Sequence, residues 1–266
     1  MSRHVAVIMG GSSVEREVSL VSGRAVEKAL ANLGYEVTPL DADHSLPALM
    51  TKFRPDVAFN ALHGRIGEDG CVQGLLEVLG IPYTHSGVLA SALAMNKPVA
   101  KQLFADAGLT CPKGRVMKLQ AVLAGEGFEP PYVIKPLNEG SSVGVHMVLS
   151  SDNYHQFRSE HWAFGDEVLV EEYIPGREIQ VAVMGDRALG AIEIRPLGRF
   201  YDYETKYTDG KAKHLMPAPI HADAYAQALD IALRAHQTLG CRGVSRSDLR
   251  YDDTSGEPGT FYLLEI

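Results

Sequence analysis

Short apolar runs alternate with amphipathic segments over the first third of the chain. An apolar run at the start is followed by the turn Gly10-Gly11 and then by apolar residues at helical spacing, a pattern that predicts a strand, a turn and a helix. The expected strands are residues 5–9, 36–40 and 57–62, and the expected helices are residues 18–33 and 72–79. The sequence therefore predicts an open parallel sheet covered by helices.

The pattern changes near Lys97, where a helix expected to reach about residue 107 leads into shorter, closely spaced strands. The expected strands are residues 114–117, 132–136, 143–148, 168–174, 179–184, 188–194, 244–251 and 260–266, with one more helix at residues 223–239. The turn Gly185-Asp186-Arg187 joins two of them as a hairpin. This density of strands and turns predicts antiparallel sheets. Residues 199–213 have no apolar periodicity, which predicts a long loop.

Composition and charge argue against several classes of protein. The chain has 266 residues and a net charge of -8, which speaks against a nucleic-acid or membrane partner because such partners select a basic face. No stretch approaches the roughly 20 apolar residues that cross a bilayer, and the charged residues 15–17 follow the first strand too closely for a signal peptide. Cys71, Cys111 and Cys241 lack the paired spacing of a zinc site or a disulfide framework. We expect a cytoplasmic enzyme whose anionic ligands meet local cations or metal ions.

A lysine beside a glycine- and serine-rich segment is the first candidate for chemistry. Lys135 ends an apolar run and is soon followed by Gly140-Ser141-Ser142-Val143-Gly144. Glycines let backbone N–H groups approach an anion closely, and a lysine supplies compact positive charge, so the segment is suited to phosphate. A hairpin with a Gly-Ser tip and a solvated lysine explains the segment equally well.

Arg246, Asp248 and Glu265 form the second candidate. The two carboxylates fall on two successive expected strands with apolar neighbours, so they are expected to be held rigidly. Two carboxylates that converge near a phosphate are a common way to hold Mg²⁺. Arg246 shares the face of Asp248 because side chains alternate along a strand. The alternative is an Arg–Asp ion pair on the surface of a sheet.

The order of these segments resembles that of the ATP-grasp superfamily. Lys135, the loop at 140–144, the run 170–174 with Glu178, and the carboxylates at 248 and 265 follow each other as in that fold. Two longer strings, at residues 10–19 and 63–74, are similar to those of D-alanine–D-alanine ligases, as is the segment 201–207. The resemblance covers the whole chain. A third possibility, an ATP-grasp ligase for another acid and amine, would not account for the string at 63–74.

The resemblance implies an α/β fold of the ATP-grasp type with three parts. These are an N-terminal substrate-binding domain with an open parallel sheet (1–95), a central small α+β subdomain (96–177) and a C-terminal catalytic α+β subdomain with an antiparallel sheet (178–266). It implies ATP-dependent joining of two D-alanines through an acyl phosphate, for peptidoglycan precursor synthesis. It also implies two Mg²⁺ ions, or Mn²⁺ in their place, and a homodimer.

Roles follow from the resemblance residue by residue. The residues implied to bind ATP are Lys97, Lys135, Ser142 and Lys206 at the phosphates, Glu171 with the backbone of Glu172 and Ile174 at the adenine, and Glu178 at the ribose. Those implied to act on D-alanine are Glu15, Ser141 and Tyr207 as a hydrogen-bonded set that closes the pocket, His63 near the first substrate, and Arg246 at the reacting carbonyl. Asp248 and Glu265 would bind Mg²⁺.

Three of these residues have plain structural alternatives. Glu15 stands three residues after Ser12, the spacing of a helix capping box. His63 ends an apolar run and could be a buried core histidine. Tyr207 belongs with Tyr201 and Tyr203 to an aromatic group that could simply pack a loop.

The end of the sequence departs from the resemblance. The family continues after the residue matching Glu265 with an asparagine that binds the second Mg²⁺ and a Pro-Gly loop that receives the second D-alanine, whereas this sequence ends at Ile266. We expect a chain of this extent to fold and to bind nucleotide, with little or no ligation; a nucleotide- or substrate-binding remnant is the alternative class. Ser247 is a smaller departure, since an apolar residue is more usual there.

Overall fold

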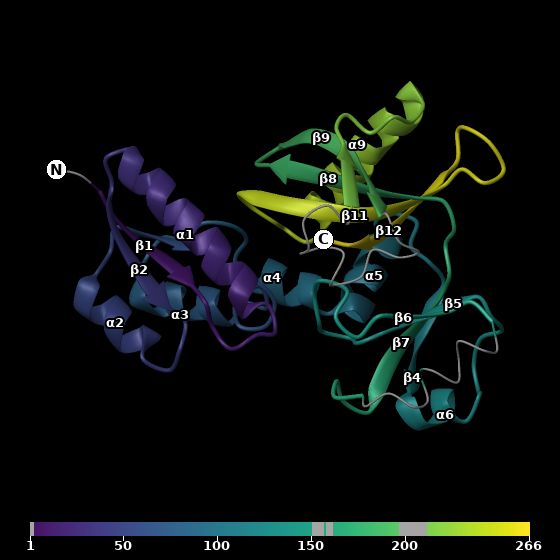
Figure 1. The fold of residues 1–266 in the computed structure, drawn as a ribbon, viewed down its shortest axis with the longest axis horizontal. Helices are drawn as coiled ribbons and strands as arrows, with labels where there is room; N and C mark the ends of the chain where they lie inside the picture. The colour runs from purple at the N-terminus through teal and green to yellow at the C-terminus, as the bar shows by residue number, and fades with distance from the viewer. Residues whose placement is uncertain (1–2, 151–156, 158–161, 197–211) are drawn as a thin grey trace. The chain divides into compact units, whose positions relative to one another are not determined.

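The computed structural model describes the chain except for residues 1–2, 151–156, 158–161 and 197–211 (Figure 1). The chain divides into two compact units. The first comprises Met1–Leu93 with Gly240–Gly243, and the second comprises Ala94–Leu239 with Val244–Ile266. The three-part division expected from the sequence stays a prediction.

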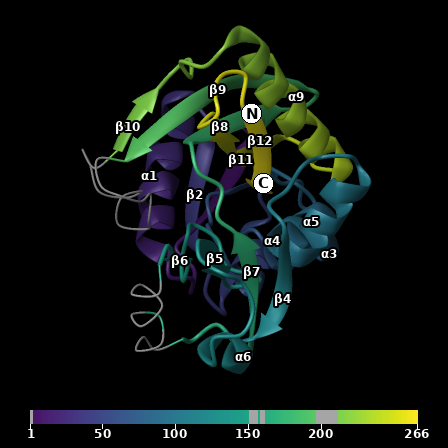
Figure 2. The same ribbon diagram turned by 90° about the vertical axis from the view of Figure 1, so that its right-hand side faces the viewer.

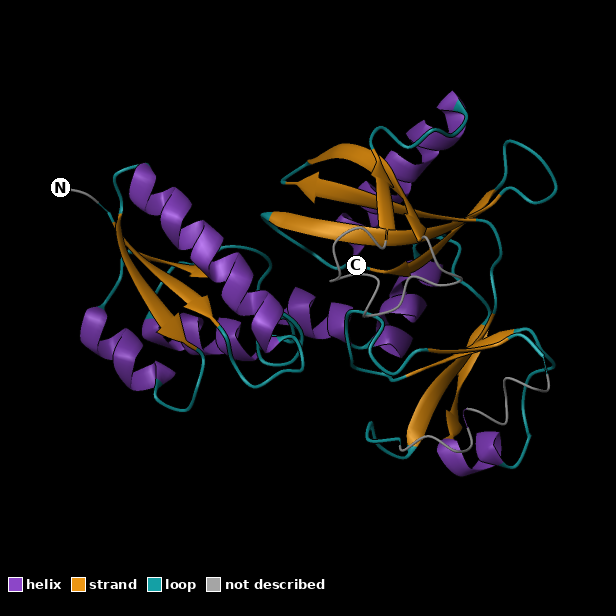
Figure 3. Ribbon diagram, viewed as in Figure 1, coloured by secondary structure: helices purple, strands orange, loops and turns teal. Residues whose placement is uncertain are grey.

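The first unit is built on a three-stranded parallel sheet in the order β2-β1-β3. The elements are β1 (His4–Met9), α1 (Arg16–Asn32), β2 (Glu36–Asp41), α2 (Leu46–Phe53), β3 (Val57–Asn60), α3 (Cys71–Leu79) and α4 (Val88–Met95), the last of which runs into the second unit. Helix α1 lies on one side of the sheet, and α2 and α3 lie on the other (Figure 3). Alternate residues of β1 pack on opposite sides, with Val7 toward α1 and Ile8 toward α2 and α3, so the central strand is apolar from Val5 to Met9.

A four-stranded antiparallel sheet forms one part of the second unit. Its order is β4-β7-β5-β6. The elements are α5 (Lys97–Asp106), β4 (Gly114–Lys118), α6 (Leu119–Leu123), β5 (Tyr132–Lys135), β6 (His146–Val148) and β7 (Glu167–Glu172). Ile134 and Val170, on neighbouring strands, are buried in its core with Val122 of α6.

A five-stranded antiparallel sheet, in the order β10-β9-β8-β11-β12, forms the other part. The elements are β8 (Arg177–Met184), β9 (Arg187–Pro196), β10 (Ala212–Leu215), α9 (Ala222–Thr238), β11 (Val244–Asp252) and β12 (Thr260–Glu265). Helix α9 packs on β8, β9 and β11 (Figure 2) through the buried alanines Ala224, Ala228, Ala232 and Ala235. Small side chains let the helix approach the sheet closely.

The expected strands and helices are confirmed to within three residues at each end, and both sheet types are as predicted. Helices α2, α4 and α6 were not predicted, because each is too short to show a clear hydrophobic period. The strand expected from residue 143 begins at His146, since the residues before it turn sharply. The loop expected at 199–213 is wrong at its end, where residues 212 and 213 belong to β10; its remainder lies outside the described residues. No described helix has the length and apolar character needed to cross a membrane.

Ser247 provides a test of core packing. It is fully buried in β11, and its hydroxyl has no hydrogen-bond partner among the described residues. A buried hydroxyl without a partner costs free energy. We expect Ser247→Ala to leave the free energy of unfolding unchanged or to raise it by up to about 1 kcal/mol, measured by urea denaturation. Leu249→Ala, in the same strand, should lower it by about 2–5 kcal/mol; a comparable loss in both variants would contradict this account of Ser247.

Candidate functional site

The second unit contains a pocket of about 470 Å³, a volume typical of small-molecule sites. It is lined by residues of β5, β6 and β7, by residues of β8, β9, β11 and β12, and by the segment that connects β7 to β8. The charged lining residues are Lys97, Lys135, Glu139, Glu171, Glu172, Arg177, Glu178, Glu193, Arg195, Asp248, Arg250 and Glu265. A concave site with so many charges is suited to a polar, charged ligand.

Three lysines lie at or beside this pocket, around the buried carboxylate of Glu171 and the half-buried carboxylate of Glu265. The Lys135 ammonium lies 2.6 Å from the Glu171 carboxylate, and Lys101 pairs with the same carboxylate while donating to the carbonyl of Pro112 at 2.7 Å. Lys97 begins α5, donates to the carbonyl of Glu139 and lies 3.6 Å from Glu265. These lysines supply compact positive charge at the pocket, which is suited to phosphate.

Burial changes the protonation of two of these lysines. Desolvation lowers the pKa of Lys135 to about 7, against an opposing effect of the nearby Glu265 carboxylate. It also lowers the pKa of Lys101 to about 8. An anion that enters the pocket would favour the charged forms, so binding and proton uptake are linked.

The glycine- and serine-rich loop has an unusual backbone. Ser141, Ser142 and Gly144 all have positive φ angles, of 52°, 60° and 68°. Such angles are uncommon for residues with a side chain, and two adjacent serines that adopt them are an outlier of the kind found at ligand-binding sites. A Cβ at position 144 would lie 2.6 Å from the ring of Phe164, so only glycine fits there. Ser142 lines the pocket.

The predicted metal ligands are neighbours. Asp248 and Glu265 face each other across the pairing of β11 and β12, and both line the pocket. Asp248 accepts two hydrogen bonds from Arg246, at 2.7 and 3.1 Å. No three metal-binding side chains cluster in the described part of the chain. The pair fits Mg²⁺ all the same, because this ion usually takes one or two carboxylates and completes its shell with phosphate oxygens and water.

Glu15 and His63 come together in the first unit. Glu15 is only 2% exposed, and its carboxylate lies against Gly64, where a Cβ would approach it to 2.6 Å. The Ser13 hydroxyl donates to the carbonyl of His63 at 2.9 Å. Helix α1 begins at Arg16, so Ser12 is not its N-cap and the capping-box alternative is wrong. The His63 side chain is 32% exposed, which excludes the buried core histidine.

The string at residues 63–74 is held by its own polar contacts. The side-chain amides of Asn60 and Gln73 both donate to the carbonyl of Gly67, at 2.8 and 2.7 Å. The Glu68 carboxylate accepts from the backbone of Gly64 at 2.6 Å. These contacts explain why so many residue types are specified in so short a string.

The structure places the other predicted residues as follows. Glu171, Glu172, Ile174 and Glu178 line the same pocket as Lys97, Lys135 and Ser142. Glu15 and His63 belong to the first unit and Ser141 to the second. Lys206 and Tyr207 lie outside the described residues, as do Tyr201 and Tyr203.

Six charged residues at or beside the pocket were missed by sequence reasoning. These are Lys101, Glu139, Arg177, Glu193, Arg195 and Arg250. Lys101 stands one helical turn after Lys97, and Glu193 and Arg195 alternate along a strand, so periodicity gave a usable signal for these three. Arg177 and Arg250 gave none, because their partners are distant in sequence.

The comparisons with known proteins agree on one family. A family model described as "D-ala D-ala ligase C-terminus" matches residues 113–266, and one described as "D-ala D-ala ligase N-terminus" matches residues 47–86. The curated D-alanine–D-alanine ligase of Granulibacter bethesdensis is 52% identical, covering 99% of this chain and 87% of the relative. That of Paramagnetospirillum magneticum is 55% identical, covering 100% and 88%. The chain belongs to the D-alanine–D-alanine ligase family.

Solved structures of the D-alanine–D-alanine ligase family share the ATP-grasp fold. The crystal structure of the ligase from Bacillus anthracis has a TM-score of 0.82 at 31% identity, covering 99% of this chain and 86% of that one. The same enzyme complexed with ATP has a TM-score of 0.80 at 27% identity, covering 99% and 85%. The VanG D-Ala:D-Ser ligase of Enterococcus faecalis has a TM-score of 0.79 at 30% identity, covering 100% and 90%.

The low pKa of Lys135 leads to a measurable proton uptake. Above about pH 7 most of this amine is uncharged without ligand, whereas bound phosphate favours the charged form. We expect ATP binding at about pH 8.5 to take up protons, measured by titration calorimetry in buffers of different ionisation heat. Lys135→Arg, which stays charged at this pH, should take up fewer. Equal uptake by both chains would show that Lys135 is not the group that titrates.

Proposed function

We propose that the pocket of the second unit binds ATP and Mg²⁺, and that the chain uses it to join D-alanines. The activity is that of the family: ATP-dependent ligation of two D-alanines to D-alanyl-D-alanine for peptidoglycan precursor synthesis. The expectation of little or no ligation stays a prediction, which D-alanyl-D-alanine formation tests. The observation that carries the site assignment is the cluster of largely buried lysines, Lys97, Lys101 and Lys135, beside the Ser142 loop and the carboxylate pair.

The pocket supports one orientation of the nucleotide. Lys97, Lys135 and the loop at Ser142 would meet the phosphates, because they supply positive charge and backbone N–H groups in a partly desolvated place. Glu171 and the backbone of Glu172 and Ile174 would read the adenine, and Glu178 would bind the ribose hydroxyls. Lys206 would join the phosphate set.

The carboxylates would complete the phosphate end. Asp248 and Glu265 would hold Mg²⁺, which supplies charge neutralisation for phosphoryl transfer. Arg246 pairs with Asp248. This ion pair would keep the Arg246 guanidinium directed toward the reacting carbonyl. Two ions are proposed, with the remaining ligands supplied by phosphate oxygens and water.

Ligation requires that a carboxylate be activated. An amine does not displace oxide from a carboxylate, so the first D-alanine takes the γ-phosphoryl group of ATP and becomes an acyl phosphate. The amine of the second D-alanine then attacks its carbonyl carbon, phosphate leaves, and an amide forms. Transfer depends mainly on positioning and on charge neutralisation, which lysines and N–H groups supply. Negative charge on the carbonyl oxygen during the attack would be stabilised by Arg246.

We propose for D-alanine binding the roles that the resemblance implies. Glu15, Ser141 and Tyr207 are assigned to the hydrogen-bonded set, and His63 is assigned to the first substrate. The burial of Glu15 against the loop of His63 supports this, because a buried carboxylate is suited to orient an ammonium or a hydroxyl. We also propose that the protein is a homodimer, which light scattering would test. We propose that it acts in the cytoplasm, where ATP is present.

Lys135→Ala tests the pocket assignment. Removing this charge should lower ATP affinity and D-alanyl-D-alanine formation by about 100-fold or more, while the variant still folds, with a lower temperature of thermal unfolding because the buried Glu171 loses one of its two partners. ATP binding is measured by calorimetry and dipeptide by chromatography. Lys118→Ala, at an exposed lysine of β4, is the control and should match the parent. Unchanged ATP affinity in Lys135→Ala would overturn the phosphate assignment.

Asp248→Asn tests the metal assignment. The variant should need a higher Mg²⁺ concentration for half-maximal ATP-dependent phosphate release, by about tenfold or more, because one charged ligand is lost. Asp252→Asn, on the same strand but bonded to Thr254, is the matched control. An Mg²⁺ requirement equal in the two variants would show that Asp248 does not hold the ion.

A further inference from the structure

The segment that connects β7 to β8 is held by an arginine of another strand. Arg250, on β11, donates from Nε to the carbonyl of Ile174 at 3.1 Å and from Nη2 to the carbonyl of Gly176 at 2.8 Å. Its Nη1 lies 4.0 Å from the Glu178 carboxylate, a charge attraction too long for a hydrogen bond. One guanidinium therefore contacts three residues of a short stretch of the chain.

The same segment is pressed onto the backbone of β11. Gly176 has a φ angle of +87°, and a Cβ at this position would overlap the carbonyl of Tyr251. A residue with a side chain would be strained here and would also clash. The segment thus runs against β11 directly beside Arg250.

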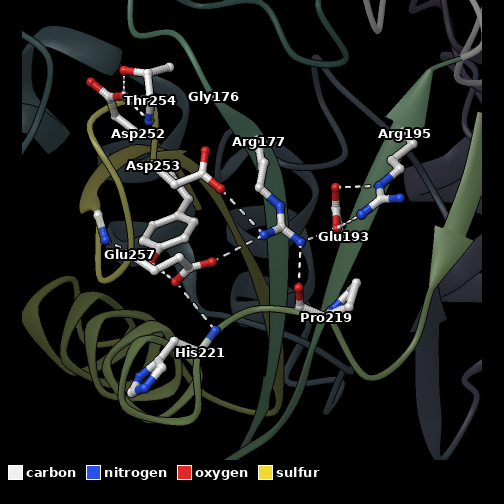
Figure 4. Close-up of polar contacts among 12 residues, drawn as sticks. Gly176, Arg177, Glu193, Arg195, Pro219, His221, Asp252, Asp253, Thr254 and Glu257 are labelled. Atoms are coloured by element: carbon white, nitrogen blue, oxygen red, sulfur yellow. Dashed lines mark hydrogen bonds and ion pairs between the residues drawn. The ribbon is translucent and has the colours of Figure 1, made fainter.

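A second arginine anchors the start of β8 (Figure 4). Arg177 donates from Nη2 to the Glu193 carboxylate and to the carbonyl of Pro219, each at 2.6 Å. Its Nη1 lies 3.4 Å from Asp253 and from Glu257. The start of β8 is tied to β9 and to the turn between β11 and β12, so the segment from Ile174 to Glu178 has little freedom to move away from Arg250.

We propose that Arg250 is a positioning residue for the nucleotide, acting through this segment. The inference rests on the proposed function, in which the backbone of Ile174 and the carboxylate of Glu178 bind the base and the ribose. By binding two carbonyls, Arg250 fixes the orientation of the peptide groups at 174 and 176. The recognition groups are then in place before the ligand arrives, which reduces the ordering cost of binding. Arg250 would affect the nucleoside part of ATP and leave the phosphate part to the lysines.

Two competitive inhibitors separate these parts of the ligand. Adenosine carries the base and the ribose, and inorganic tripolyphosphate carries only the phosphates. Each is measured against ATP with the complete chain, its D-alanine substrate and Mg²⁺. In Arg250→Met we expect the inhibition constant of adenosine to rise about tenfold, while that of tripolyphosphate stays within about twofold. KM for ATP should rise, whereas kcat and KM for D-alanine should stay nearly unchanged.

Two further variants complete the design. Arg250→Lys keeps the charge but loses the two-point donor geometry of the guanidinium. Adenosine should therefore bind this variant more weakly than it binds the parent, and tripolyphosphate should bind both equally well. This variant decides the question if Arg250→Met does not fold. Arg187→Met, at an exposed arginine of β9 in the same sheet, should behave as the parent.

The outcomes distinguish a failure of the role proposed for Arg250 from a failure of the proposed orientation of the nucleotide. An unchanged adenosine constant in a folded Arg250 variant overturns the inference, and so does equal weakening of both inhibitors, which would indicate general damage. If adenosine does not compete with ATP in the parent chain, the proposed orientation of the nucleotide fails instead.

Discussion

The buried carboxylate of Glu171 is the interaction on which the pocket depends. It is almost fully buried on β7 and pairs with two lysines, Lys101 from α5 and Lys135 from β5. Each ammonium in a desolvated place costs free energy unless an opposite charge meets it. Glu171 meets two of them at once, which joins a helix and two strands at the wall of the pocket. Loss of Glu171 would leave both lysines without their shared partner.

Arginines have the corresponding role on the five-stranded sheet. Arg250 holds the segment after β7 through its carbonyls, and Arg177 joins the start of β8 to Glu193 and to the turn after β11. A planar guanidinium can donate in several directions from one fixed group. The chain passes from the four-stranded to the five-stranded sheet through this segment, so its orientation affects how residues of both sheets face one ligand. The lysines would provide positive charge for the phosphates, and the arginines would fix the orientation of the backbone groups that face the nucleoside.

Much of the fold and part of the site could be predicted from the sequence. The apolar runs at residues 5–9 and 57–62 gave the parallel strands, because a strand buried on both faces must be apolar throughout. The close spacing of strands after Lys97 gave the antiparallel sheets. The pairing of Asp248 with Glu265 followed from their place on two consecutive strands. Lys135 and Ser142 line the same pocket, whereas their role at the phosphates stays a prediction.

The sequence by itself determined which strands and helices form and which family the chain resembles, since both depend on local periodicity and on short strings of residues. Only the tertiary structure decided which charges meet. Lys101 with Glu171, Arg177 with Glu193, and Arg250 with the carbonyl of Ile174 join residues that are 16 to 76 positions apart. A sequence pattern shows what each side chain can do, whereas its partner depends on how distant strands are brought into register. The positive φ angles of Ser141 and Ser142 belong to the same class, because packing around a loop imposes them and local preference opposes them.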